Sequence, residues 1–269
     1  MNQRILTELN KEPNKTKQYV ILVAVLLGAF IWSLSALNFN AMDEGGGKIA
    51  ANILKGIVQP DTNLLFNGTK QGVPYLLFET ICIAFLGTIF GAILSIPIAF
   101  LMAPSIMPKP VYLFMRAFVV VIRTIPALVY GLMFIRVTGP GPFAGVMTMS
   151  LTSIGMVSKL YVDVIEEIDT GILESMDSFG CTTFEKIRFG IIPQLIANFT
   201  SITIYRFDMN LRDATILGLV GAGGIGAPLI FAMNSYRWNQ VGSILIGLIV
   251  LILIVEVVSN YLRGKLVNG

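Results

Sequence analysis

The stretch PYLLFETICIAFLGTIFGAILSIPIAFLMA, residues 74–103, decides the class of this protein. Its 30 residues include one charged side chain, Glu79. A transmembrane helix needs about 20 predominantly apolar residues, so this stretch is long enough to cross a bilayer. The apolar residues are continuous and do not alternate with polar ones, as they would in a membrane β-strand. Residues 74–103 are therefore predicted to form a membrane-spanning helix.

The same pattern recurs along the chain. Of the 269 residues, 55% are hydrophobic and 13% are charged, whereas soluble domains carry roughly 25% charged residues. We therefore predict an all-α integral membrane protein with about six transmembrane helices. The predicted spans are 18–39, 74–103, 111–137, 142–163, 194–218 and 241–262.

The composition excludes several classes of function. The absence of histidine excludes Ser-His-Asp catalysis, HExxH zinc sites and histidine proton relays. Cys82 and Cys181 are too far apart in sequence to suggest a metal cluster, and no metal site is predicted. The net charge is +3 with no cluster of lysine and arginine, so no nucleic-acid partner is expected.

Basic residues near both ends predict the orientation. The first 17 residues carry four of them and the C-terminal segment carries Arg263 and Lys265. Six spans place both termini on one side of the membrane, and the positive-inside rule makes that side cytoplasmic. Residues 40–73 are then external. Within them, residues 48–58 place Ile49, Ile53 and Ile57 on one face, which fits either an interfacial helix or a docking ledge for an external partner.

The loop at residues 164–193 is the largest cytoplasmic element by this topology. It is amphipathic: Glu174 and seven other charged residues are interspersed with an apolar set. It is too small for an enzyme domain but large enough for a helical bracket that binds another protein. The apolar set is Ile172, Leu173, Met176, Phe179 and Phe184.

Residues 221–226, GAGGIG, match the dinucleotide pattern G-x-G-x-x-G by letter only. That fingerprint requires a preceding strand within a βαβ unit, and here a membrane helix precedes it. Four glycines in six residues instead predict a break in the helix, which favours a gate or a pore-lining bend. Residues 139–142, GPGP, predict a tight turn between the third and fourth spans.

Charged residues within the predicted fifth span are costly at membrane depth and are commonly functional. Asp208 and Arg212 are four residues apart on a helix and can pair, while Arg206 lies on a neighbouring stripe with Asn210 and Asp213. Two interpretations remain open. Either the arginines are neutralised structurally, or Arg206 or Arg212 faces a pathway and attracts an anion.

The third span carries Arg123 shortly before Pro126, which is expected to kink the helix. A kink beside a buried arginine suggests a cavity wall. Together with the features of the fifth span and the glycine-rich stretch, this gives the candidate pathway or gate residues: Arg123, Pro126, Arg206, Asp208, Arg212, Gly221, Gly223 and Gly224.

The cytoplasmic loop resembles the EAA loop of ABC-importer permeases. Glu174, Gly180 and Pro193 stand at the matching positions. The sequence departs from the pattern at four others: Ser175 and Met176 replace the two alanines, Gly190 replaces isoleucine and Ile192 replaces leucine.

Further segments resemble the phosphonate-type permeases, and the resemblance covers residues 74–265. These segments are RTIPALV at 123–129, GPGPFAG at 139–145, KLY at 159–161, YRFDMNLR at 205–212 and LGLVGAGGIG at 217–226.

The resemblance implies a type I permease domain at 74–265 with a coupling loop at 164–193. A cytoplasmic N-terminus at 1–17, a first transmembrane helix at 18–39 and an external segment at 40–73 precede this domain. It implies an importer of phosphonates or related phosphorus oxyanions in the bacterial inner membrane. The residues expected to couple it to an ATPase are Glu174, Ser175, Met176, Gly180, Ile192 and Pro193.

The implied partners are two ATPase subunits, a second permease copy (identical or paralogous), an external substrate-binding protein and the lipid bilayer. This chain is expected to be no enzyme and to bind no cofactor, because it has no G-x-x-x-x-G-K-[ST] loop. The partner ATPase would use ATP and Mg²⁺. The alternatives are a methionine-type or other small-solute permease, a secondary transporter or channel, and a membrane-embedded enzyme.

Overall fold

The computed structural model describes residues 16–36, 46–182 and 185–268, and the regular elements in these ranges are all helices. The predicted all-α class is confirmed. The chain divides into two compact units, residues 1–50 and 51–269. In the first unit, α2 (Thr16–Ser35) is long and apolar enough to cross a membrane, as predicted for 18–39. The predicted cytoplasmic N-terminus, 1–17, lies almost entirely outside the described residues.

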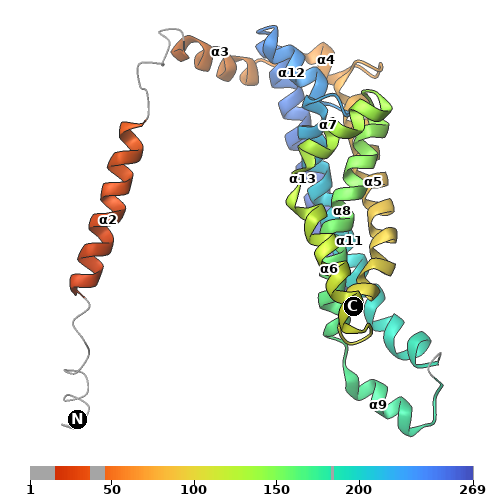
Figure 1. Ribbon diagram of the computed structural model, residues 1–269. Coiled ribbons are helices and arrows are strands. Elements are labelled where there is room, and N and C mark those ends of the chain that lie inside the picture. The colour runs from red at the N-terminus through yellow and green to blue at the C-terminus, as the bar shows by residue number, and fades with distance from the viewer. Residues whose placement is uncertain (1–15, 37–45, 183–184, 269) are drawn as a thin grey trace, which may run out of the picture. The chain divides into compact units, whose positions relative to one another are not determined.

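The second unit is a helical bundle. Figure 1 shows α4 and α12 at one end of it and α9 at the opposite end. Its elements are the later part of α3 (Gly46–Val58), α4 (Thr62–Phe66), α5 (Val73–Met102), α6 (Lys109–Thr124), α7 (Ala127–Thr138), α8 (Pro142–Glu166), α9 (Thr170–Ser178), the π-helix η2 (Lys186–Ile191), α11 (Ile192–Leu219), α12 (Gly226–Asn234) and α13 (Trp238–Asn268).

The pairing of α5 with α8 forms the centre of the bundle, and α11 packs against both. Gly87 and Gly91 are four residues apart and face α8. A Cβ atom at Gly87 would overlap Met149, and one at Gly91 would overlap Ser153. The two helices approach closely because these positions are small, as is common in membrane helix pairs, where van der Waals packing drives association.

Three buried apolar clusters follow the bundle from end to end. Tyr161 and Leu195 belong to the cluster at the α9 end. Met149 and Leu211 belong to the middle one, between α5, α8 and α11. Ile225 belongs to the third, where α12 and α13 meet the start of α5. The core therefore continues along the whole length of the central helices.

The predicted span at 111–137 bends at Pro126, as the proline predicts, and the bend is sharp. It is two helices, α6 and α7, bent by 84° at the break between them. Pro126 has no N–H to donate to the carbonyl of Ile122, four residues earlier. The buried Tyr130 hydroxyl donates to that carbonyl instead, at 3.2 Å. The carbonyl that Pro126 leaves without a backbone donor therefore has a side-chain donor, and the break is a stable part of the fold.

The predicted spans at 74–103, 142–163 and 241–262 correspond to α5, α8 and α13, which are long and apolar enough to cross a membrane. The fifth predicted span, 194–218, corresponds to α11. Its 28 residues are long enough, but it is absent from the sufficiently apolar helices. The reason is its four charged residues, Arg206, Asp208, Arg212 and Asp213.

Within the described ranges, four helices meet the length and composition criteria, or five if the bent pair is one span. The count of six spans, which adds α11, and the orientation of the termini stay predictions.

Replacing Tyr130 with phenylalanine leaves the Ile122 carbonyl buried without a donor. We expect a loss of about 1–2 kcal/mol of stability, the cost of an unsatisfied buried acceptor. Thermal unfolding of the purified protein in detergent measures it as a midpoint lowered by a few degrees. Tyr261→Phe is the matched control, because Tyr261 is largely exposed on α13. Equal midpoints for the two variants would contradict the proposed role of this hydrogen bond.

Candidate functional site

A buried polar layer ties α11 to its neighbours in the middle of the bundle. Arg206 is only 5% exposed. Its Nε donates to Ser153 Oγ at 3.1 Å, and its Nη2 donates to Thr152 Oγ1 at 3.2 Å. Its Nη1 lies 3.2 Å from the sulfur of Met156. All these partners are on α8 and all are neutral, so the guanidinium is held by hydrogen bonds and not by a carboxylate among the described residues.

Asn210 extends this layer to a third helix. It is completely buried one turn after Arg206. Its Nδ2 donates to Ser153 Oγ of α8 and to Thr88 Oγ1 of α5, each at 2.8 Å. Its Oδ1 has no hydrogen-bond partner within the described ranges. One amide therefore connects α5, α8 and α11 where no water is available to replace these bonds.

The predicted pair of Asp208 and Arg212 is confirmed, with Nη2 and Oδ2 3.1 Å apart. Arg212 also lies 3.5 Å from Glu256 of α13, a residue for which the sequence predicted no role. The Asp208 side chain is 9% exposed and that of Arg212 is 45% exposed. The carboxylate of Asp208 is thus neutralised, while the arginine head group reaches the surface of the chain.

Arg123 was predicted to be buried, and this is wrong: it is exposed on the last turn of α6. The reason is that its stem lies across α8 at Gly155, which has no side chain to displace it; a Cβ at Gly155 would lie 2.8 Å from Arg123 Cγ. Long basic side chains often pack the stem and leave the head group free. Arg123 forms no salt bridge with any residue in the described ranges.

The glycine-rich stretch is the turn from α11 to α12. Gly221, Gly223 and Gly224 have φ of +96°, +85° and +71°, in the region that favours glycine. Side chains from α5 hold this turn: Glu79 Oε1 accepts from the Gly224 N–H at 2.9 Å, and Thr80 Oγ1 accepts from the Ile225 N–H at 3.0 Å. The predicted helix break is confirmed, and in this conformation the turn is packed against protein.

A second turn docks on the same stretch. The GPGP sequence at 139–142 connects α7 to α8, as predicted, and Gly141 donates its N–H to the Gly221 carbonyl at 2.9 Å. A Cβ at Gly223 would lie 2.7 Å from Pro142 Cα, so only glycine fits there. The two glycine turns and the start of α5 thus form one interlocked end of the bundle.

At the opposite end, α9 begins and ends with well-formed caps. Asp169 accepts from the Gly171 N–H at 2.8 Å. After the helix, Gly180 has φ +74°, and Cys181 donates its N–H to the Met176 carbonyl at 3.1 Å. Nothing lies within 4 Å of a Cβ built at Gly180. This glycine is therefore required by the left-handed backbone of the turn and not by lack of space.

The predicted apolar face of the loop is partly visible. Phe179 is 87% exposed and Ile172 is also exposed. Glu174 and Ser175 are exposed on the same short helix. The side chain of Leu173 and the whole of Phe184 lie outside the described residues. Because these apolar side chains are exposed, this face of α9 is available to a partner protein.

Polar contacts close the loop and lead back into the bundle. Lys186 pairs with Asp177 of α9. The Thr182 N–H and hydroxyl both donate to Glu185 at 2.8 Å, and these bonds hold the pKa of Glu185 below its ordinary value. The chain then passes through η2 into α11, which begins two residues before the predicted span and carries Pro193 in its first turn.

Several residues of these sites were missed from the sequence: Thr80, Thr88, Thr152, Ser153, Glu79 and Glu256. A usable signal did exist for Glu79, which is the one charged residue in an apolar stretch of 30. The small hydroxyl residues gave no such signal, because serine and threonine commonly bond their own helix, as Thr88 does with the Ala84 carbonyl. No group of residues suited to a metal ion occurs in the described ranges.

The family model for the binding-protein-dependent transport system inner membrane component matches residues 95–267. The chain is 35% identical over 190 residues to the phosphate-import permease PhnE of Mycolicibacterium smegmatis, covering 70% of this chain and 36% of that relative. It therefore spans about a third of the length of that protein. It is 29% identical over 245 residues to the phosphite transport permease PtxC of Stutzerimonas stutzeri, covering 90% and 87% of the two chains.

Among solved structures, a chain of the inward-facing MetNI methionine ABC transporter matches with a TM-score of 0.61. The identity is 19%, and the match covers 71% of this chain and 94% of that one. Likeness at this identity shows the fold alone.

Replacing Glu79 with alanine removes the acceptor for the Gly224 N–H, whereas Glu79→Gln keeps a carbonyl oxygen there. We expect Glu79→Ala to lose about 1–2 kcal/mol, because a half-buried donor is left unpaired, and Glu79→Gln to lose much less. Limited proteolysis at residues 221–226 measures the effect directly, as faster cleavage in the alanine variant. Equal cleavage in both variants would show that the carboxylate does not hold this turn.

Proposed function

Because the chain belongs to the family of binding-protein-dependent transport system inner membrane components, we propose that it is the permease subunit of an ATP-driven importer of phosphonates or related phosphorus oxyanions. The observation that carries the substrate class is the match along nine-tenths of the chain to a phosphite permease. The match to a phosphate-import permease supports the same chemistry. The chain has the type I permease fold and is a transport subunit, not an enzyme.

An exposed arginine of this chain supports the binding of such an anion. Arg123 and Arg212 both have head groups at the surface of the single chain, and Arg123 has no carboxylate partner in the described ranges. Guanidinium groups match the oxygens of phosphate-like anions with forked hydrogen bonds. We assign the attraction of the anion to Arg123, because the charge of Arg212 is already offset by Asp208 and Glu256. Arg206 is buried and hydrogen-bonded to α8, which supports a role as an anchor of α11.

The loop at 164–193 couples transport to the partner ATPase, which binds and hydrolyses ATP with Mg²⁺. Two ATPase subunits, a second permease copy and an external binding protein complete the transporter. Closure of the ATPases moves the α9 brackets, where Glu174, Ser175 and Met176 lie, and α8 and α11, which flank the loop, follow. Ile192 and Pro193 fix the start of α11 to this lever. The protein then switches between two discrete packings, which is alternating access.

We propose that the chain lies in the bacterial inner membrane with both termini cytoplasmic. In this orientation α9 faces the ATPases, and the glycine turns 139–142 and 221–226 lie at the external end. Because Gly221, Gly223 and Gly224 join α11 to α12 without a side chain of their own, they suit a hinge at the external gate. Pro126 lies at the 84° break between α6 and α7, which is a second place where the backbone leaves the helical conformation and can act as a hinge.

A methionine-type permease is the second candidate. The likeness to a methionine transporter supports a shared fold and carries no information on the substrate. A secondary transporter or channel would function without an ATPase or a binding protein, which the family membership opposes.

Uptake in cells tests the substrate. Labelled 2-aminoethylphosphonate, phosphite and methionine are supplied to a strain that lacks the gene and has no redundant importer, with and without the gene restored. We expect uptake of a phosphorus oxyanion to disappear and return with the gene, while methionine uptake stays constant. Unchanged uptake of the phosphorus compounds, or a loss of methionine uptake, would contradict the proposal.

The turn at Gly180 gives a matched pair of variants for coupling. Valine at φ +74° is strained by about 1–2 kcal/mol, enough for about a ten-fold loss of correctly formed loops. Asparagine tolerates this conformation. We therefore expect Gly180→Val to reduce uptake about ten-fold while Gly180→Asn stays near wild type. ATP hydrolysis measured in the same vesicles shows whether hydrolysis continues without transport. Full uptake by the valine variant would show that coupling does not depend on the conformation of this turn.

A further inference from the structure

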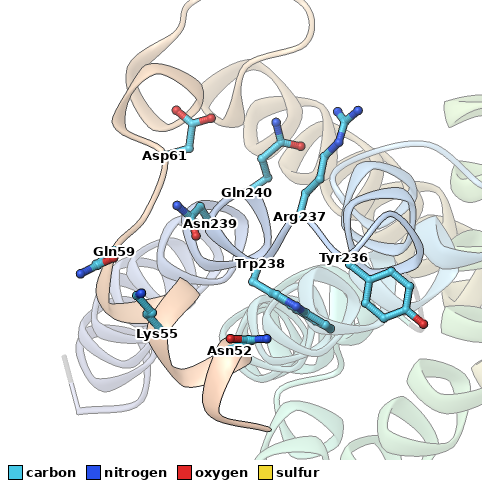
Figure 2. Close-up of a pocket in the computed structure, with 9 residues that line it drawn as sticks. All are labelled: Asn52, Lys55, Gln59, Asp61, Tyr236, Arg237, Trp238, Asn239 and Gln240. Carbon is cyan, nitrogen blue, oxygen red and sulfur yellow. The ribbon is translucent and has the colours of Figure 1, made fainter. Parts of the chain in front are cut away.

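A polar pocket of about 590 Å³ is lined by residues near the end of α3 and the start of α13. Figure 1 shows α12, which leads into α13, at the end of the bundle away from α9. Figure 2 shows side chains from two separate segments around the pocket: the end of α3 with the residues that follow, and the turn after α12 with the first turn of α13. Neither the transport pathway nor the coupling loop uses these residues. Those that matter here are Asn52, Lys55, Gln59, Arg237, Asn239 and Gln240.

The two walls of this pocket are fixed to each other through their backbones. A Cβ at Gly56 would overlap the carbonyl of Trp238, and one at Gly242 would overlap the carbonyl of Gly56. Asp61 donates its N–H to the Asn239 carbonyl at 3.1 Å, and this hydrogen bond joins the segment after α3 to the start of α13. The polar pocket is therefore preformed, and a ligand would not have to order it.

The charge of the polar pocket is positive. Lys55 and Arg237 are both exposed and form no salt bridge with any described residue. The one carboxylate in the lining, Asp61, is occupied as the N-cap of α4, where it accepts from the N–H groups of Asn63 and Leu64 at 3.1 and 3.3 Å. Its charge is directed at the helix end and not at the two cations. Amide side chains add further donors, so the pocket suits an acidic group.

The turn that supplies one wall is strained. Tyr236 has φ +56° and is the one non-glycine residue with positive φ in the described ranges. Such strain costs about 1–3 kcal/mol and clusters at functional sites. The conformation sets Tyr236 edge-to-face against Trp238, with ring centroids 5.9 Å apart, and leaves Tyr236 largely exposed. Tyrosine, tryptophan and arginine are the residue types that contribute most often to the binding energy of protein interfaces.

We propose that the polar pocket is a docking socket for an acidic loop of the external binding protein. The inference rests on the proposed function, which places this end of the bundle outside the membrane. A volume of 590 Å³ is in the range of pockets that hold drug-sized ligands, and is much larger than a free phosphonate needs. Preformed walls, two cations without a carboxylate partner in the described ranges and the exposed ring of Tyr236 together fit a carboxylate on a protein surface better than a small diffusing anion.

Charge reversal in the complete transporter tests the socket. The complex is placed in nanodiscs with its ATPase, and the affinity of the purified binding protein is measured for the wild type and for the double variant Lys55→Glu and Arg237→Glu. Reversal at a rim changes association and salt dependence, so we expect about a ten-fold weaker Kd and a smaller effect of salt. The control is Lys70→Glu, which reverses an exposed charge outside the pocket and is expected to leave the Kd within about two-fold.

A photo-cross-linker gives an independent measurement. Placed at Gln240, it is expected to form a covalent product with the added binding protein; at Val257, an exposed apolar position on α13, it is expected to form none. Basal ATP hydrolysis should be equal in all variants, which shows that each complex is folded.

The outcomes separate the two proposals. Unchanged Kd in the double variant, while the binding protein still stimulates ATP hydrolysis by the wild type, would overturn the socket alone. Absence of stimulation and of phosphorus oxyanion uptake by the wild type would overturn the proposed function. A third outcome is that labelled inorganic phosphate binds to the complex without binding protein and that the double variant loses this binding. If the Kd of the double variant for the binding protein is unchanged as well, the pocket is a binding site for the free anion, and the socket is overturned.

Discussion

The hydrogen bonds that Asn210 makes to Thr88 and Ser153 are the constraint on which the rest of the bundle depends. Polar groups inside a membrane must be satisfied by protein, because no water replaces a lost partner. Arg206 adds a charge to the same layer and is held on α8 by Ser153 and Thr152. Since these residues are on α5, α8 and α11, sliding one helix past another would leave several buried groups unpaired. The three helices are thereby expected to move as one body.

This constraint connects the two ends of the bundle. At one end, α8 and α11 flank the loop that carries α9, so a displacement of the loop acts on both helices together. At the other end, α11 continues into the turn at 221–226, which Glu79 and Thr80 of α5 hold in place. The glycine conformations there and the break at Pro126 are the points where the backbone can bend without unfolding a helix. A rigid centre with hinges at its edges is suited to switching between two packings.

The sequence was sufficient for the class of fold and for local features that depend on residue type. Apolar stretches predicted α5, α8 and α13, the spacing of Asp208 and Arg212 predicted their ion pair, and the glycines of residues 221–226 predicted the helix break there. It was insufficient where tertiary contacts decide. Pro126 predicted a kink, but whether the chain bends slightly or by 84° depends on whether Tyr130 can supply the missing donor. The exposure of Arg123 depends on Gly155, which is 32 residues away in the chain. The polar pocket joins α3 to the start of α13, and no local pattern reveals that contact.

The distance between α8 and α11 tests the rigid centre most directly. Spin labels at Lys159 and Asn198, both exposed, are attached through cysteines in a chain with Cys82→Ser and Cys181→Ser. Pulsed electron paramagnetic resonance then compares the complete transporter without nucleotide and trapped with ATP and vanadate. If the polar layer fixes the two helices, the distance distribution stays the same in both states. A shift of the distribution on trapping, with uptake intact in the labelled protein, would show that α8 and α11 separate during transport and would contradict this mechanism.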